Sequence, residues 1–162
     1  MNDKPSLHID PVERTWILIS VGILVIFAIA VTIAGFAMGI QVPAPVARVD
    51  PRKVASEGEF ANPGLRELAP GKYEAYILAQ TWQFNPKEIR IPVGSEITFY
   101  VTSKDVQHGF KLEGTNINMQ IVPGQVSSLS ATFEKVGTFN FVCTEYCGAA
   151  HAIMYGQLIV EP

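Results

Sequence analysis

The sequence predicts an all-β sandwich with Greek-key connections, preceded by one membrane-spanning α-helix. Two observations lead to this fold class. From Tyr73 onward, apolar and polar residues alternate over short segments that Gly and Pro turn signals separate, which is typical of strands with one buried face. Near the N-terminus, residues 16–40 contain no charged residue. The length of 162 residues suits one domain and one additional segment.

The apolar segment at residues 16–40 is long enough to cross a membrane. As an α-helix it would extend about 38 Å, which exceeds the hydrocarbon core of about 30 Å. Trp16 stands at its start, where an interfacial ring is expected. A cleaved signal peptide would have a shorter apolar core, although small residues at Val46-Ala47 leave that alternative open. We therefore expect a tail at residues 1–15 and a transmembrane anchor helix at residues 16–40.

The charged residues do not settle which way the anchor is oriented. Lys4 and Arg14 precede it, and Arg48, Arg52 and Lys53 follow it, so the positive-inside rule does not place the N-terminus inside. The net charge is −3, and the chain lacks the basic patch with interleaved aromatic residues that indicates nucleic-acid binding. We therefore expect the membrane, and no nucleic acid, among its partners.

Residues 41–72 mix Pro, Ala, Gly and charged residues, which indicates a connector. Within it, Asp50-Pro51 has the form of an N-cap followed by Pro at the first helical position, which predicts a short helix through about Glu57. The sandwich domain then covers residues 73–162. Its alternating segments predict strands near residues 73–81, 88–92, 96–103, 107–113, 117–122, 126–134, 137–143 and 155–160.

The last quarter of the chain gathers sulfur and imidazole side chains at close spacing. Cys143 ends one predicted strand, and Cys147, His151 and Met154 fall between it and the last predicted strand. His108 lies on a strand that can reach the same end of the sandwich. Thiolate, thioether and imidazole donors favour copper over magnesium, calcium or manganese. The sequence therefore predicts a copper site at this end of the domain.

The number of donors distinguishes several kinds of site. A mononuclear blue-copper site uses two His, one Cys and a weak axial Met, which leaves one thiol unused. A single tetrahedral ion held by two Cys and two His would favour zinc and leave Met154 idle. A disulfide between Cys143 and Cys147 would leave the other donors unexplained. Two metals that share two bridging thiolates would use every donor, with a backbone carbonyl such as that of Glu145 completing the set.

The motif Cys-x-Glu-x-Cys-Gly-x-x-His-x-x-Met at residues 143–154, with His-Gly-Phe at residues 108–110, resembles subunit II of cytochrome c oxidase. The resemblance covers nearly the whole chain and implies a cupredoxin-like sandwich with a binuclear copper centre, CuA. The single membrane helix and residues 108–118 resemble the B-type (ba-type) branch of the haem-copper oxidases. The copper ligands that the resemblance implies are His108, Cys143, Cys147, His151, Met154 and, through its main-chain oxygen, Glu145.

The resemblance also implies a function and partners. Electrons would pass from a soluble cytochrome c or a similar donor, through copper, to haem in subunit I, where oxygen is reduced and protons are pumped. No catalytic residue is then expected in this chain. Trp82 and Phe84 are implied near the surface where electrons enter, with Trp82 as the entry residue; the alternative for Trp82 is a core aromatic at the end of a strand. The Glu145 side chain would reach a magnesium ion at the boundary with subunit I. The alternative is that Glu145 contributes only its main-chain carbonyl.

Other functions fit the same residues. They are the CuA subunit of a haem-copper nitric-oxide reductase, a membrane-tethered mononuclear copper carrier, and a copper-delivery module that binds Cu(I) exchangeably. For the oxidase subunit, we expect a single-pass protein of the bacterial plasma membrane. The copper chemistry, rather than the charge distribution, leads us to expect the copper domain on the periplasmic or extracellular side.

Overall fold

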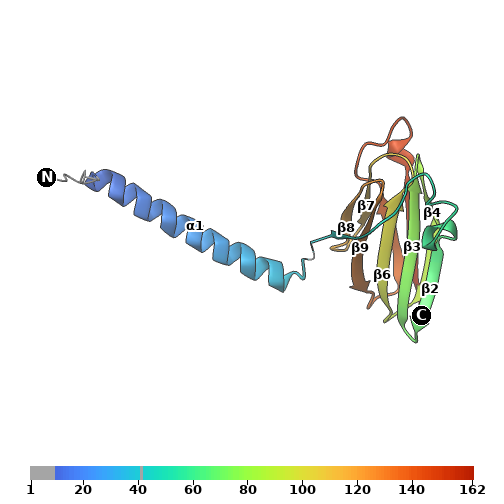
Figure 1. The fold of residues 1–162 in the computed structure, drawn as a ribbon. Helices are drawn as coiled ribbons and strands as arrows, with labels where there is room; N and C mark the ends of the chain where they lie inside the picture. Colours follow the sequence, from blue (N-terminus) through green and yellow to red (C-terminus); the bar gives the residue numbers. More distant parts are fainter. Residues whose placement is uncertain (1–9, 41) are drawn as a thin grey trace. The chain divides into compact units, whose positions relative to one another are not determined.

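The computed structural model describes residues 10–40 and 42–162. One unit of the chain is an N-terminal helix, and the other, from residue 41 onward, is a β-sandwich (Figure 1). The predicted fold class is therefore confirmed. Residues 1–9 of the predicted tail lie outside the described residues.

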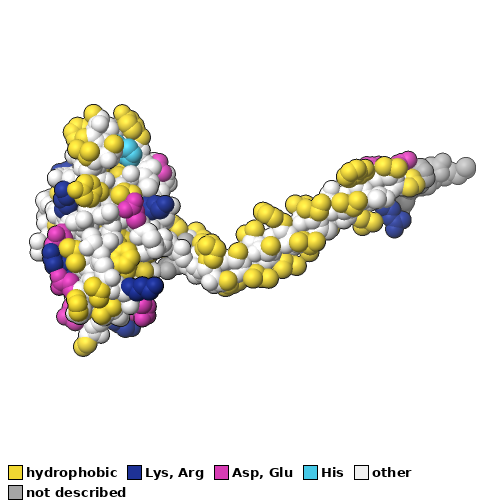
Figure 2. All heavy atoms as spheres, turned by 180° about the vertical axis from the view of Figure 1, so that it is seen from behind, with side chains coloured by type: hydrophobic (Ala, Val, Ile, Leu, Met, Phe, Trp, Pro, Cys, Tyr) yellow, Lys and Arg dark blue, Asp and Glu magenta, His cyan; other side chains and the backbone are white. Residues whose placement is uncertain are grey.

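Helix α1 spans Pro11–Ala37. Asp10 caps it, because its carboxylate accepts a 2.8 Å hydrogen bond from the backbone N–H of Val12, and Pro11 has the fixed φ that suits a first helical position. The helix therefore begins before the predicted start at Trp16. Its most apolar 18-residue stretch has a mean hydropathy of 3.0, and none of that stretch is buried within the chain. Figure 2 shows apolar side chains along the visible face of the helix. Its length and composition fit a single membrane span.

Two sheets form the sandwich. Their strands are β1 (Ala44–Arg48), β2 (Gly64–Ala69), β3 (Lys72–Gln80), β4 (Gln83–Asn85), β5 (Glu88–Pro92), β6 (Glu96–Ser103), β7 (His108–Leu112), β8 (Asn118–Ile121), β9 (Gln125–Thr132), β10 (Gly137–Val142) and β11 (Tyr155–Glu161). One sheet has the order β1-β9-β6-β3-β2, with β4 paired to β3, and the other has the order β5-β11-β10-β7-β8. Most neighbours are not consecutive in sequence, so the chain crosses repeatedly between the sheets, as in Greek-key folds.

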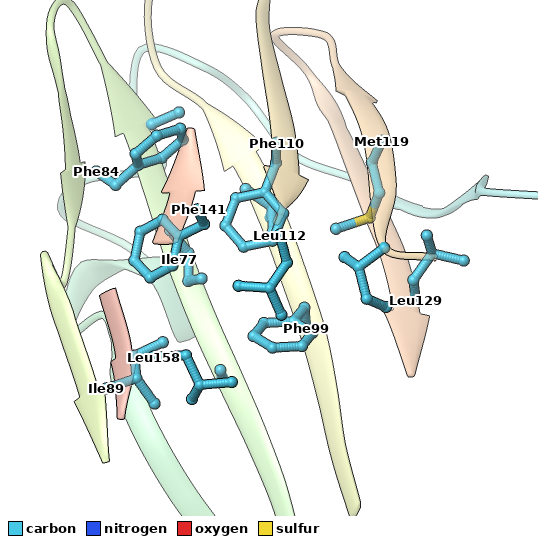
Figure 3. Packing of buried hydrophobic residues seen from close by; sticks show 14 of the residues in the cluster. Ile77, Phe84, Ile89, Phe99, Phe110, Leu112, Met119, Leu129, Phe141 and Leu158 are labelled. Carbon is cyan, nitrogen blue, oxygen red and sulfur yellow. The ribbon is translucent and has the colours of Figure 1, made fainter. Parts of the chain in front are cut away.

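Aromatic residues fill the space between the sheets directly beneath the predicted metal site. Phe99 on β6, Phe110 on β7 and Phe141 on β10 are fully buried (Figure 3). The rings of Phe110 and Phe141 stack with their centroids 5.1 Å apart. Phe110 follows His108 by two residues and Phe141 precedes Cys143 by two. The core therefore fixes the ends of the two strands that lead to the predicted donors.

The predicted connector contains two strands that the sequence analysis missed. β1 pairs with β9, and β2 pairs with β3. All residues of β1 are exposed, so this edge strand carries no alternation of apolar and polar residues. β3 matches the strand predicted near residues 73–81, but the sequence analysis also missed β4, which follows β3 after a turn and pairs with it.

The short helix predicted from Asp50 through about Glu57 is wrong. The carboxylate of Asp50 does accept a backbone N–H two residues further on, at 3.0 Å, but isolated turns follow it. The short 3₁₀ helix η1 comes later, at Glu59–Ala61. Val54 and Phe60 are buried in a small cluster with residues of β3 and β9. Burial of both side chains against the sheet outweighs the preference of the local sequence for one regular helix.

Candidate metal centre

Four of the five predicted side-chain donors lie in the loop between β10 and β11. Cys143 follows the last residue of β10, and Met154 precedes the first residue of β11. The backbone N–H of Cys143 donates a 3.1 Å hydrogen bond to the carbonyl of Met154, which closes the loop at its base. A 3₁₀ turn, η2 (His151–Ile153), shapes its second half. The loop is therefore short, closed and continuous with the sheet.

His108 approaches the loop from β7, which pairs with β10. Its neighbour Gly109 lies directly against the loop. A Cβ atom at Gly109 would lie 2.8 Å from the backbone nitrogen of Thr144 and 3.0 Å from that of Glu145. Any side chain at position 109 would therefore push the loop away from β7, and glycine lets the donors of the two segments converge.

The two thiols occupy the centre of the donor cluster. The Cys143 sulfur lies 3.8 Å from the Cys147 sulfur and 3.8 Å from Nδ1 of His108. The Cys147 sulfur lies 3.7 Å from Nδ1 of His151 and 3.6 Å from the sulfur of Met154. Donor atoms of His108, Cys143 and Cys147 all lie within 4.8 Å of one another. Each thiol therefore has one imidazole beside it.

These separations suit donors that share metal ions. Two ligands that each lie about 2.3 Å from a tetrahedral ion are about 3.8 Å apart. Both cysteines are free, so the disulfide alternative is not what this structure contains. Thiol, thioether and imidazole groups are soft or borderline donors, and the residues present therefore fit copper.

The donors are largely shielded from water. His108 is fully buried, and Cys143, Cys147 and Met154 are at most 8% exposed. A cavity of about 360 Å³ reaches Cys143, Met154 and the half-buried His151 from one side. Burial, together with the electrostatic interaction and the hydrogen bond with neighbouring Cys143, raises the pKa of the Cys147 thiol to about 11. This thiol is therefore protonated at neutral pH in the metal-free chain, and a metal ion must displace its proton on binding.

Asp105, which the sequence analysis did not single out, orients His108. Its Oδ1 atom lies 2.9 Å from Nε2 of His108, which leaves Nδ1 directed toward Cys143. Its Oδ2 atom accepts hydrogen bonds from the backbone N–H of Thr81 at 2.7 Å and from the Thr81 hydroxyl at 3.0 Å. Carboxylates commonly hold a metal-binding His in this way. An acidic residue three positions before a candidate His was the available sequence signal.

The environment of Asp105 favours its charged form. Burial acts to raise the pKa of this carboxyl group. The hydrogen bonds from His108, from the backbone N–H groups of Thr81 and Val106 and from the Thr81 hydroxyl outweigh burial, and they lower the pKa from 3.8 to about 2. The carboxylate therefore remains ionised at neutral pH and carries a full charge beside the imidazole.

Glu145 presents its carbonyl oxygen to the centre and its side chain to a neighbour. The carbonyl lies 3.2 Å from the Cys143 sulfur. The carboxylate accepts a 3.3 Å hydrogen bond from the side-chain amide of Gln107, another residue that the sequence analysis missed. Within the described residues, the group of three or more His, Cys, Asp or Glu donors is that of His108, Cys143 and Cys147. This part of the chain gathers no such group around the Glu145 carboxylate.

The two predicted aromatic residues have different environments. Phe84 is 2% exposed, and its ring packs edge-to-face on Phe110 and Phe141 in the core. Trp82 is 44% exposed, and its indole N–H donates a 3.2 Å hydrogen bond to the carbonyl of Cys147. Of the two, Trp82 alone combines surface exposure with contact to the ligand loop.

The fold and the donor cluster define a class of protein: an all-β domain on an apolar N-terminal helix, with soft metal donors in its last interstrand loop. Comparison with known proteins identifies the family. The family model for the periplasmic domain of cytochrome c oxidase subunit II matches residues 75–161. Cytochrome c oxidase subunit 2 of Thermus thermophilus is 39% identical over 99% of both chains. The chain belongs to the cytochrome c oxidase subunit II family.

Solved structures agree with this assignment. A chain in the cryo-EM structure of a heme-copper terminal oxidase dimer is 35% identical, with a TM-score of 0.71, and the match covers 93% of this chain and 99% of that one. The periplasmic domain of cytochrome oxidase subunit II from Bradyrhizobium japonicum shares the fold, with a TM-score of 0.51, 23% identity and coverage of 54% of this chain and 83% of that chain. Membership of this family implies that the chain binds copper.

Proposed function

We propose that this chain holds a binuclear copper centre, CuA. The observation that supports this proposal is the symmetry of the donors about the two thiols. Beside Cys143 lie one imidazole and the Glu145 carbonyl, and beside Cys147 lie one imidazole and the Met154 sulfur. A mononuclear blue-copper site uses only one thiolate. The proposed ligands are His108, Cys143, Glu145, Cys147, His151 and Met154.

Membership of the family indicates that the chain functions in electron transfer. As a cytochrome c oxidase subunit II, the chain accepts electrons and passes them to haem in subunit I of a haem-copper terminal oxidase. Oxygen reduction and proton pumping belong to the assembled enzyme. Subunit I and a soluble cytochrome c or similar donor are therefore its partners.

The surroundings of the donors suit electron transfer. A bound copper pair would supply the redox chemistry, and an electron shared by two metals would halve the change of charge at each. The chain holds these donors rigidly. Cys143 follows β10 directly and His108 begins β7, and the two strands pack together through the stacked rings of Phe110 and Phe141. Burial keeps water from most of the donors. Few groups therefore rearrange when the charge changes.

We place the docking surface of the electron donor at the end of the sandwich that carries the ligand loop. Large apolar side chains are exposed there, with Tyr146 and Ile153 on the loop 81% and 71% exposed and Trp82 beside it. Figure 2 shows hydrophobic side chains and few charges at the upper end of the domain, where Figure 1 places this loop. Such a surface suits a small, transient and largely apolar contact. Trp82 is the residue through which we expect electrons to enter.

A magnesium ion at the boundary with subunit I is a separate proposal for Glu145. A carboxylate oxygen is a suitable ligand for magnesium, and Gln107 holds this carboxylate in place. The remaining ligands would come from subunit I. Metal analysis of the assembled oxidase tests this proposal, because Glu145→Gln should remove magnesium while the carbonyl of residue 145 and the copper content are retained.

The proposed location is the bacterial plasma membrane, with α1 as the single anchor. The copper domain would face the periplasm or the cell exterior, as the description of the matching family domain indicates. Protease treatment of intact spheroplasts tests this orientation. Digestion of the copper domain from outside is expected, and protection until the membrane is permeabilised would contradict it.

Copper counting on the full-length chain in detergent tests the central proposal. Two coppers per chain are expected, with an electron paramagnetic resonance hyperfine pattern that shows one unpaired electron shared by both metals. The matched variants Cys143→Ser and Cys147→Ser should each lose that shared pattern. One copper per chain, or a mononuclear pattern in the unaltered protein, would contradict the binuclear centre and favour a mononuclear carrier.

A further inference from the structure

The indole of Trp82 contacts the backbone of the ligand loop at one defined place. Its N–H donates a 3.2 Å hydrogen bond to the carbonyl of Cys147. A Cβ atom on the next residue, Gly148, would lie 2.8 Å from the indole nitrogen and 3.5 Å from Cε2 and Cζ2 of the ring. Gly148 also has a φ of +120°, which L side chains rarely adopt. Glycine at this position therefore lets the indole rest directly on the Cys147–Gly148 peptide.

The residue before Trp82 contacts the other half of the donor cluster. The backbone N–H and the hydroxyl of Thr81 both donate to Oδ2 of Asp105, at 2.7 and 3.0 Å. Oδ1 of Asp105 lies 2.9 Å from Nε2 of His108. The two-residue segment Thr81-Trp82 thus reaches His108 through one carboxylate and the Cys147 backbone through one indole. The segments that carry His108 and Cys147 are far apart in the sequence.

We propose that Trp82 is a positioning residue for the metal centre, whose indole N–H fixes the Cys147–Gly148 peptide and with it the Cys147 sulfur. The proposal rests on the proposed function of this cluster as a copper site. The Cys147 sulfur lies next to both His151 and Met154, so a turn of its peptide would disturb three donors together. At the surface, water can replace a lost indole donor but cannot hold the carbonyl in one direction.

The positioning role and the electron-transfer role of Trp82 require different chemical groups. An aromatic ring suffices for a relay near a docking surface, whereas positioning requires the N–H group. Trp82→Phe keeps a ring and removes the donor, so it separates the two roles. The other tryptophan, Trp16, lies in α1, and Trp16→Phe is a matched control for exchange of an indole outside the copper domain.

The test uses the full-length, copper-loaded chain in detergent. The rate of copper loss to an excess of a Cu(I) chelator is measured after reduction, and the hyperfine pattern and visible absorption are recorded before it. Trp82→Phe should release copper about two- to tenfold faster, the range expected for loss of one neutral hydrogen bond, and should alter the spectra. Trp16→Phe should match the unaltered protein. Unchanged release and unchanged spectra in Trp82→Phe would overturn the proposal, whatever happens to the rate of electron transfer.

A second variant tests whether the contact itself is responsible. Gly148→Ala places a methyl group against the indole nitrogen and should also speed copper release. If Trp82 acts through this contact, the double variant should release copper more slowly than the product of the two single effects predicts. Failure of the binuclear assignment is recognised separately, because the unaltered chain would then hold fewer than two coppers.

Discussion

The carboxylate of Asp105 lies 2.9 Å from Nε2 of His108, and the opposite ring nitrogen, Nδ1, faces the sulfur of Cys143 at 3.8 Å. The two nitrogens of an imidazole are chemically distinct, and the hydrogen bond that one makes decides which of them is available to a metal. Asp105 therefore selects the donor atom of His108. It is itself held by Thr81 and Val106, so the selection is made by a loop that is fixed before any metal binds.

Replacing Asp105 with Asn should destabilise the metal-free chain in a pH-dependent way. The folded chain lowers the pKa of Asp105 from 3.8 to about 2, so its ionised form favours folding above about pH 4. This contribution is lost as the pH falls from about 4 toward 2. Urea unfolding at pH 7 should show a loss of about 1 kcal/mol for Asp105→Asn, because the carboxylate is partly exposed and screened.

The same comparison at pH 3 should give a smaller difference between Asp105→Asn and the unaltered chain. Glu134 is an exposed carboxylate, and Glu134→Gln serves as the control, with little change at either pH. A loss for Asp105→Asn that stays constant from pH 7 to pH 3 would show that shape, rather than charge, accounts for the effect.

Gly109→Ala should disturb the donor cluster although position 109 supplies no donor. The added methyl group would lie 2.8 Å from the Thr144 backbone nitrogen, and overpacking of this kind costs about 1–3 kcal/mol. Chemical unfolding of the metal-free chain should show that loss, and the copper content should fall because the loop moves away from His108. Gly137→Ala is the control, since its Cβ would make an ordinary 3.7 Å contact with Phe139. Equal behaviour of the two variants would contradict this account.

The sequence alone was sufficient to predict those features of the protein that depend on neighbouring residues. Buried strands such as β6 alternate with a period of two, and the loop donors fall within a few residues of one another, so pattern and spacing predicted both. The exposed edge strand β1 has no such pattern. The contacts that orient the donors are not local either, because Thr81 and Asp105 are separated by 24 positions and Trp82 and Cys147 by 65. Which distant loops meet at the end of the sandwich depends on strand order.

Phe84→Leu should affect stability and leave electron transfer unchanged. Phe84 is buried and its ring packs against Phe110 and Phe141, so the smaller side chain should lower the free energy of unfolding by about 1–2 kcal/mol, less than the about 3–5 kcal/mol typical of Phe→Ala. The rate at which a reduced donor transfers electrons, normalised to bound copper, should match that of the unaltered chain. A severalfold slower rate in a fully copper-loaded Phe84→Leu variant would show that Phe84 takes part in electron transfer.

Charged residues at position 153 should weaken docking of the electron donor without changing the copper centre. Ile153 is 71% exposed on the ligand loop, and an apolar contact there excludes water that a charged side chain would retain. In the assembled oxidase, Ile153→Lys and Ile153→Glu should each raise KM for the reduced donor severalfold and leave kcat unchanged, because the lost interaction belongs to binding rather than to transfer. Leu68 is similarly exposed, at 64%, and lies just before the turn into β3, whereas Trp82 follows the opposite end of that strand. Leu68→Lys is therefore a control at the far end of the sandwich.

The two charges at position 153 distinguish the kinds of docking: an apolar contact is weakened by both, whereas electrostatic steering would make one variant bind better and the other worse. Opposite effects of Lys and Glu, with a marked dependence on salt, would contradict a largely apolar docking surface.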